Sequence, residues 1–157
     1  MKLIQDTREQ TPLDFSGFEY ITETVVEYLN VGDYTVEYSD GYRPPVIFER
    51  KSIGDLYGTL GKGYERFKKM LARADKQGIS IILIIEGSLS KVAKGHRYSR
   101  VMKGYVVVKR LFSMKIKHCE VVFCKDRVET AKYIYEYFCA IGRLKGKKIK
   151  KGVKNGQ

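Results

Sequence analysis

Two carboxylates and a lysine stand at a spacing that could hold a metal ion beside a phosphate group. Glu49 and Lys51 are two residues apart, so on an extended chain their side chains point to the same face. Asp33 follows Gly32 in an earlier turn. Carboxylate oxygens are the hard ligands that Mg²⁺ and Mn²⁺ prefer, and a nearby ammonium group can orient water or offset charge on phosphoryl oxygens. This set suits the hydrolysis of a phosphodiester bond.

The same kinds of residue also have a purely structural interpretation. A glutamate and a lysine two apart at a strand end commonly form a solvated salt bridge that contributes little stability. Asp55, three residues after Ser52, fits a capping box at a helix start as well as it fits a site. Three further acidic residues follow expected strand ends: Asp6, Glu9 and Glu86. Convergence of those strand ends in the fold would favour a site.

The elements that must position these residues form an α/β pattern. Runs of apolar, β-branched or alternating residues predict strands over residues 2–5, 21–29, 34–38, 45–50, 79–85 and 120–123. Helical spacing of apolar residues predicts helices over 53–60, 64–77, 88–93, 101–117 and from Asp126 onward.

Two of these strands carry further expectations. Strands 21–29 and 34–38, joined by a turn, are expected to pair as a hairpin. The continuous apolar strand 79–85 is expected to be central and buried on both faces. The charged cluster lies where strand 45–50 gives way to a helix, and ligands bind at such places in open α/β sheets.

The chain is strongly basic, with a formal net charge of +12. Seven cations and no acidic residue lie between Arg143 and Lys154, and the rest of the chain is also positively charged. Such charge favours a polyanionic partner, with nucleic acid ahead of a membrane, although excess lysine can also serve solubility alone. We therefore distinguish a folded domain, residues 1–142, from a basic tail, residues 143–157, that is expected to be disordered in isolation.

The three cysteines indicate a reduced protein. Cys119, Cys124 and Cys139 are odd in number and lack CxxC spacing, so we expect reduced thiols on core faces. The longest apolar run is too short to span a membrane, and the N-terminus has no signal-peptide pattern. The expected location is the cytoplasm, either at the nucleoid or in the host's cytoplasm for a phage-encoded chain.

The order of the charged residues resembles the motif of the XPF-type nuclease domain family. Gly32-Asp33 is followed, after a variable gap, by Glu49-Arg50-Lys51 and then by Asp55 after three further residues. Similarity extends to Asp6-Thr7-Arg8-Glu9, to Glu65-Arg66-Phe67 and to the strand ending in Glu86-Gly87. It covers roughly residues 1–142, and segments near residues 98–100 and 129–131 resemble stand-alone bacterial and phage members.

The resemblance implies a fold, a reaction and a set of roles. The fold is restriction-endonuclease-like, a mixed central sheet flanked by helices. The reaction is cleavage of DNA, often branched or junction DNA, with Mg²⁺ or Mn²⁺ and without a small-molecule cofactor. By matching position, Asp33 and Glu49 become metal ligands, Lys51 the catalytic lysine, and Arg50 a site residue touching the ligand shell or the phosphate. The accessory residues are Asp6, Glu9 and Asp55.

Basic side chains are expected to hold the DNA backbone, and the resemblance also implies a homodimer formed through the last helices. The expected DNA-binding residues are Arg8, Arg66, Lys69, Arg73, Arg97 and Arg100. The alternative for the helix that carries three of them is an ordinary solvated face. Tyr64 stands where related domains often carry an arginine, so an ionic phosphate contact is missing there.

Two other functions stay open. A non-catalytic nucleic-acid-binding module would keep the nuclease fold but is expected to lose an acidic or lysine position, whereas Asp33, Glu49 and Lys51 are all present. A basic RNA-binding or assembly protein would rely on the tail and would leave the acidic cluster unexplained.

Overall fold

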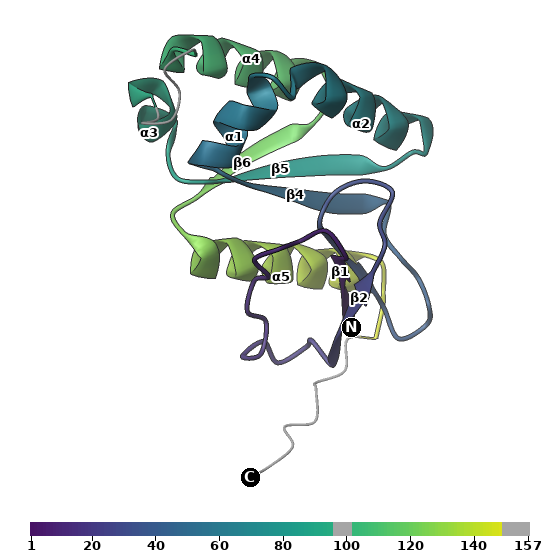
Figure 1. Cartoon of the computed structure of the whole chain (residues 1–157). Helices are drawn as coiled ribbons and strands as arrows, with labels where there is room; N and C mark the ends of the chain where they lie inside the picture. Colours follow the sequence, from purple (N-terminus) through teal and green to yellow (C-terminus); the bar gives the residue numbers. More distant parts are fainter. Residues whose placement is uncertain (96–101, 149–157) are drawn as a thin grey trace.

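A six-stranded sheet lies between helices in the structure, a computed structural model that describes residues 1–95 and 102–148 (Figure 1). The strands are β1 (Lys2–Asp6), β2 (Glu23–Glu27), β3 (Tyr34–Glu37), β4 (Val46–Ser52), β5 (Ser80–Glu86) and β6 (Glu120–Cys124). The helices are α1 (Ile53–Leu60), α2 (Tyr64–Lys76), α3 (Leu89–Lys94), α4 (Gly104–Lys117) and α5 (Arg127–Leu144).

The sheet is mixed, with the order β2-β1-β3-β4-β5-β6. Strands β4, β5 and β6 are parallel, β3 runs antiparallel to both of its neighbours, and β2 pairs with β1 in parallel. Helices α1 to α4 lie on one side of the sheet and α5 lies on the other (Figure 1). The expected α/β class, a mixed central sheet flanked by helices, is therefore confirmed.

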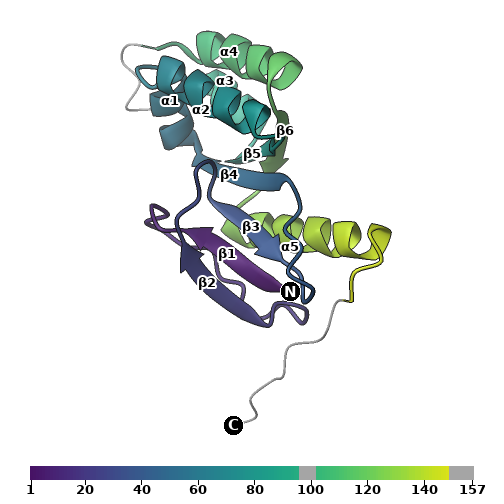
Figure 2. The same cartoon turned by 90° about the vertical axis from the view of Figure 1, so that its right-hand side faces the viewer.

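The expected hairpin between the second and third strands is wrong, because β1 lies between them (Figure 2). Ile4 pairs in parallel with Val25 on one side and antiparallel with Thr35 on the other. The reason is burial. Residues 3–6 of β1 are all buried, whereas β2 leaves Val26 60% exposed. The strand that can be buried on both faces takes the inner place, and the more exposed strand forms the edge.

Strand β5 lies between two hydrophobic layers and contributes side chains to both, as its continuous apolar run predicts. Leu83 and Ile85 pack in the layer under α1, α2 and α4, whereas Ile82 and Ile84 pack in the layer above α5. All four side chains are buried. The three cysteines are buried within these layers and form no disulfide bond among the described residues, as expected.

Helix α5 continues to Leu144, two residues past the expected domain boundary at 142. After it, the Lys147 Nζ atom lies 2.7 Å from Asp40 Oδ2 and 4.3 Å from the ring centroid of Tyr42. The beginning of the basic segment is therefore attached to the turn between β3 and β4. The expectation of a disordered tail concerns mostly residues 149–157, which lie outside the described residues. In the described ranges, no helix combines the length and apolar character needed to cross a bilayer.

Candidate active site

Three strand ends meet at Asp33. Its backbone amide donates to the Phe48 carbonyl oxygen at 2.7 Å, and its carbonyl oxygen accepts from the Asp6 amide at 2.8 Å. The Arg50 amide donates to Asp33 Oδ2 at 2.8 Å. These bonds tie the start of β3 to the carboxyl end of β1 and to the middle of β4, so backbone hydrogen bonds orient the carboxylate.

Gly32 makes the close approach of these strands feasible. Its φ is +71°, in the left-handed region, and an added Cβ would lie 2.3 Å from Ile47 Cγ2. A larger residue would be both strained and sterically blocked. The glycine before Asp33 is therefore required by the turn that positions the carboxylate.

The alternation of β4 places Glu49 and Lys51 on the same side as Asp33. Glu49 is in register with Leu83 and Lys51 with Ile85, which belong to the layer under α1 to α4. Together with Asp33 they line a pocket of about 400 Å³. The other lining residues come from the β2–β3 connection, from α1 and α2 and from Arg8: Arg8, Asn30, Val31, Gly32, Thr59, Gly63, Arg66, Phe67, Met70 and Arg73.

The charges in this pocket perturb one another strongly. Lys51 Nζ lies 2.5 Å from Glu49 Oε1, and Glu49 is only 7% exposed. Burial, together with the negative charge of Glu49, raises the pKa of Asp33 from 3.8 to about 7. Burial alone would lower the pKa of Lys51, but the charge and hydrogen bond of Glu49 outweigh it and raise that pKa. Lys51 is therefore a protonated donor in this state.

The pair of carboxylates fits a hard divalent cation. Among the described residues no group of three His, Cys, Asp or Glu side chains could enclose a metal ion. Mg²⁺, however, needs only one or two carboxylates, because it keeps several waters and substrate oxygens in its shell. Burial and the negative charge of Glu49 both raise the pKa of Asp33, so the two carboxylates repel each other in the pocket. A cation between Asp33 and Glu49 would relieve this repulsion.

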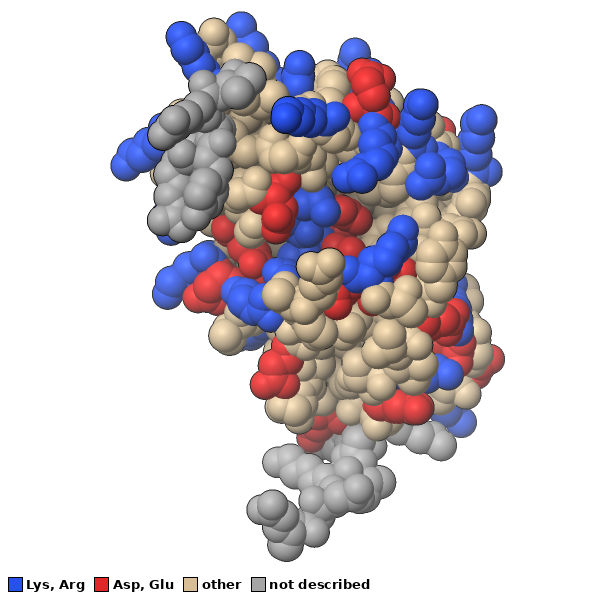
Figure 3. Space-filling model, viewed as in Figure 1, with Lys and Arg blue, Asp and Glu red and all other residues tan. Residues whose placement is uncertain are grey.

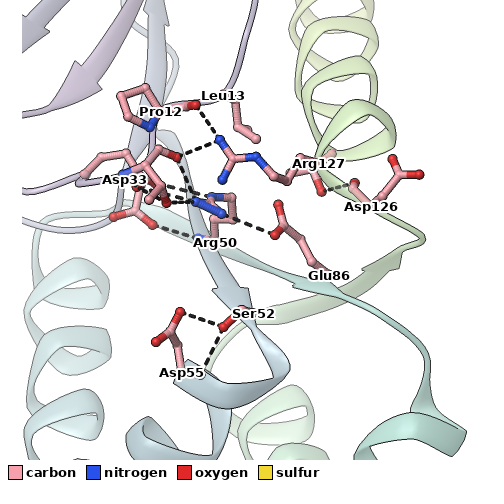
Figure 4. A network of polar contacts seen from close by, with 12 residues as sticks. Pro12, Leu13, Asp33, Arg50, Ser52, Asp55, Glu86, Asp126 and Arg127 are labelled. Atoms are coloured by element: carbon pink, nitrogen blue, oxygen red, sulfur yellow. Dashed lines mark hydrogen bonds and ion pairs between the residues drawn. The ribbon is translucent and has the colours of Figure 1, made fainter.

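Arg50 lies on the opposite side of β4 from its two neighbours. It is in register with Ile84, and its side chain is 8% exposed in the layer toward α5. The guanidinium contacts Glu9 Oε2 at 3.3 Å and Glu86 Oε2 at 3.2 Å, and donates to the Thr11 carbonyl oxygen at 2.9 Å (Figure 4). The side chain is thus directed away from the pocket, and Arg50 meets the site through its backbone amide.

The network around Arg50 also ties the N-terminal loop to α5 through contacts at the surface. Arg127 donates to the carbonyl oxygens of Thr11 and Pro12 at 3.0 and 2.6 Å (Figure 4). Glu86 Oε1 is buried and finds no hydrogen-bond partner among the described residues. Glu9, expected as an accessory residue at the site, is placed in this network rather than in the pocket lining.

Asp6 acts as a clamp beneath the pocket. It is 1% exposed and accepts from Arg8 Nε at 2.6 Å and from the Leu29 amide at 2.7 Å. Burial alone would raise the pKa of Asp6, but these hydrogen bonds outweigh it and the pKa lies below its usual value. The clamp holds Arg8, a pocket-lining residue, in a fixed position.

Asp55 adopts the capping role that its spacing allows. Its amide donates to Ser52 Oγ at 3.1 Å, and Ser52 Oγ lies 2.7 Å from Asp55 Oδ2 (Figure 4). This capping box satisfies donors at the start of α1. Asp55 is exposed and does not line the pocket.

The basic residues separate into three groups. Arg66 and Arg73 of α2 line the pocket, whereas Lys69 is exposed on the same helix but is not a lining residue. Figure 3 shows Lys and Arg side chains over the upper helices, with Asp and Glu side chains gathered below them across the middle. The other two expected DNA-binding residues, Arg97 and Arg100, lie outside the described residues.

Other residues around the pocket carry no signal in the sequence. Asn30 and Thr59 reach it only because the β2–β3 connection packs against α1 and α2. Tyr64 is half-buried and lies under two cations, with Lys68 Nζ at 5.0 Å and Arg110 Cζ at 4.6 Å from its ring centroid. The Arg110 guanidinium, on α4, also donates to the Leu60 carbonyl oxygen, and neither Tyr64 nor Arg110 lines the pocket.

Comparisons with known proteins bear on this geometry. A family model described as "ERCC4 domain" matches residues 5–137. The chain is similar to the structure "XPF from Aeropyrum pernix", with 19% identity and a TM-score of 0.65, over 93% of this chain and 68% of that one. It is also similar to "XPF from Aeropyrum pernix, complex with DNA", with 20% identity and a TM-score of 0.60, over 92% of this chain and 64% of that one. A search among curated proteins gave no match. At these identities the structural likeness shows the fold.

Proposed function

The chain belongs to the ERCC4 domain family, the family of XPF-type nuclease domains, and we propose that it is a divalent-metal-dependent endonuclease that hydrolyses DNA at branched or junction structures. The observation that carries the proposal is the pocket in which Asp33, Glu49 and Lys51 converge beneath the basic side chains of Arg66 and Arg73. Paired carboxylates for a cation and a cationic rim for phosphates are what phosphodiester hydrolysis requires.

Each pocket residue has a definite task in this proposal. Asp33 and Glu49 hold Mg²⁺ or Mn²⁺, which when bound supplies Lewis-acid activation of the phosphate and of water. Lys51, kept protonated by Glu49, donates a hydrogen bond to a phosphoryl oxygen and offsets the charge that develops there. Arg8, Arg66 and Arg73 bind the flanking phosphates.

DNA as the polymer is supported by the relative whose structure contains DNA. This chain spans about two thirds of the length of the two Aeropyrum pernix chains, so their full set of partners is not carried over. The preference for branched DNA rests on the family. A homodimer through the last helices is part of the proposal. Because α4 and α5 lie on opposite sides of the sheet, their exposed residues Ile116 (80%) and Val128 (78%) belong to two separate surfaces. Sedimentation of the wild type, of Ile116→Glu and of Val128→Glu tests the dimer and identifies the helix that forms it.

The decisive experiment compares carboxylate variants with a matched surface control. Asp33→Asn and Glu49→Gln keep shape and remove charge, and Glu136→Gln removes an exposed carboxylate from α5. Cleavage of flap, fork, Holliday-junction, single-stranded and duplex DNA is measured with Mg²⁺, Mn²⁺ or chelator. We expect both pocket variants to lose metal-dependent cutting while binding DNA equally or more tightly, because a charge that repels phosphate is gone.

Two outcomes would contradict the proposal. Wild-type cutting rates in both pocket variants would place the active site elsewhere. Wild-type protein that binds these DNAs but cuts none of them with either metal would instead support the non-catalytic binding module.

A further inference from the structure

A second hollow lies beside the candidate active site, on the far side of the β2–β3 connection. Its volume is about 370 Å³, and it shares Asn30 and Val31 with the first pocket. Its remaining walls are mostly apolar and come from β2, from the segment before β4 and from the end of α2: Glu27, Tyr28, Leu29, Thr35, Arg43, Pro44, Pro45, Ile47, Gln77 and Ile79. The two hollows are thus neighbours along one surface.

Tyr28 presents an aromatic ring in this second hollow. The side chain is 61% exposed, and the Arg8 guanidinium carbon lies 5.1 Å from its ring centroid. The backbone next to the ring is fixed, because the Leu29 amide donates to buried Asp6 and the Leu29 carbonyl oxygen accepts from Arg8 Nη2 at 2.6 Å. An exposed ring on a fixed backbone loses little freedom when it binds something.

Arg8 connects the two hollows. It lines the first pocket, contacts the ring of Tyr28, and is held by Asp6 Oδ1 at 2.6 Å. Asp6 and the Leu29 carbonyl oxygen engage Nε and Nη2 of Arg8, but the side chain is 55% exposed. A phosphate bound through Nη1 would therefore lie between the carboxylate pair and the aromatic ring. A nucleic-acid strand that passes from one hollow to the other would have its backbone near Arg8.

The charge of the second hollow suits a base rather than a phosphate. Its one arginine, Arg43, is already paired with Glu27 and Glu37, each at 2.7 Å. Asn30 and Gln77 are exposed residues that line the hollow, and a carboxamide offers both donors and acceptors to the edge of a base. Apolar walls, an exposed aromatic ring on a fixed backbone and amide groups are features that bind an unstacked nucleobase.

We propose that the second hollow binds one unpaired nucleobase of the DNA strand held in the active site, stacked on Tyr28, with the adjoining phosphate on Arg8. The inference rests on the proposed function, because the strand must lie in the first pocket. A base inside a duplex has both faces covered by its neighbours, so only a strand with an unpaired nucleotide beside the cut can use the ring. The hollow would thus select single-stranded or junction DNA over continuous duplex.

The test separates stacking from general DNA affinity. Tyr28→Leu removes the ring and keeps apolar bulk, Tyr28→Trp keeps a ring, and Tyr105→Leu is the matched control. Tyr105 is 58% exposed on α4 and has Lys109 Nζ 5.7 Å from its ring centroid, so it is a similar cation-paired tyrosine elsewhere. Binding is measured without cleavage, in chelator, to a flap and a duplex that each carry 2-aminopurine, whose fluorescence falls on stacking.

We expect Tyr28→Leu to weaken flap binding by about fivefold or more and duplex binding by less than about twofold, as the loss of one base–aromatic stack predicts. The fluorescence change on the flap should disappear in Tyr28→Leu and persist in Tyr28→Trp and Tyr105→Leu. Equal losses on flap and duplex, or a Tyr28→Leu protein that binds like the wild type, would overturn the inference. Wild-type protein that neither binds nor cuts any DNA would instead reject the proposed function. Melting curves serve as the control that each variant is folded.

Discussion

The two faces of β4 receive consecutive charged residues and use them differently. On the face toward α1 to α4, Glu49 and Lys51 line a pocket that is open to ligands. On the face toward α5, the Arg50 guanidinium is enclosed between Glu9 and Glu86. On the first face, burial and the neighbouring charge of Glu49 raise the pKa of Asp33. The second face pairs its charge internally and joins segments that are far apart in the sequence.

Within three consecutive residues, Glu49 and Lys51 are available to a substrate, whereas Arg50 stabilises the fold. A charge that acts on a substrate must be reachable and incompletely paired, whereas a buried charge that holds the fold must be paired to offset its desolvation. Arg50 therefore belongs to the second class in this structure, and its contribution to the site passes through the amide that holds Asp33. The roles expected from the family for Asp33, Glu49, Lys51 and Arg50 stay predictions, which the following variants test.

The largest effect is expected on the pocket face. Lys51→Ala removes the cation beside the phosphate and should lower the cleavage rate by about 10²–10³-fold, the usual loss for one electrostatic group aimed at developing charge. DNA affinity should weaken only slightly. Single-turnover cleavage in Mg²⁺ and equilibrium binding measure the two quantities. A structural Glu49–Lys51 salt bridge would instead give a small loss of stability and unchanged cutting.

The next effect is expected on the enclosed face. Arg50→Met leaves Glu9 and Glu86 without their cation and should reduce the free energy of unfolding by about 3 kcal/mol. Chemical denaturation measures it, and Glu86→Gln in the same chain should restore part of the loss. If Arg50 touches the phosphate instead, Arg50→Met will lose cutting while its stability stays at the wild-type value.

A further effect concerns the pH dependence of stability. The folded-state pKa of Asp33 is raised from 3.8 to about 7, so the folded chain binds more protons than the unfolded chain between those values. In the metal-free protein this carboxyl therefore lowers the free energy of unfolding as pH rises from about 4 to about 7. Asp33→Asn should be more stable than the wild type at pH 8, by up to about 4 kcal/mol, and equally stable near pH 3. Chemical denaturation across this pH range measures the difference, which will stay constant from pH 3 to pH 8 if Asp33 has an ordinary pKa.

The smallest effect is expected at the rim. Arg73→Gln should weaken DNA binding by a few-fold and reduce the salt slope by about one phosphate contact, whereas Lys69→Gln, on the same helix but outside the pocket lining, should change both less. Binding titrations at several salt concentrations measure the slope. Equal effects at both positions would show that the whole exposed face of α2 holds DNA, not the pocket wall alone.

Much of the fold and of the pocket follows from local patterns in the sequence. Period-two alternation put Glu49 and Lys51 on one face, and strand ends followed by acidic residues indicated where the site lies. The same alternation places Arg50 on the other face, so its orientation was readable from the spacing. The family motif groups Glu49, Arg50 and Lys51 as site residues, although alternation along the strand separates Arg50 from the other two.

Other features depend on contacts between distant segments, which spacing does not encode. The Asp6 clamp needs the amide of Leu29, and the network around Arg50 needs Thr11 beside Arg127. The position of β1 between β2 and β3 depends on which strand can be buried on both faces, a property of the assembled sheet. Asn30 becomes a pocket residue only through that assembly.

The three buried cysteines can report how often the structure around each of them opens. Cys119 and Cys124 stand at or beside the two ends of β6, and Cys139 lies in the middle of α5. Burial raises the pKa of Cys119 to about 11 and also raises the pKa of the other two thiols, so none reacts readily while the fold is closed. A thiol reagent therefore modifies each cysteine at the rate at which its own surroundings open. Three variants that each keep one of the native cysteines would therefore measure the opening rates of the two sides of the sheet separately. Cys119 reports on the side of α1 to α4, and Cys124 and Cys139 report on the side of α5.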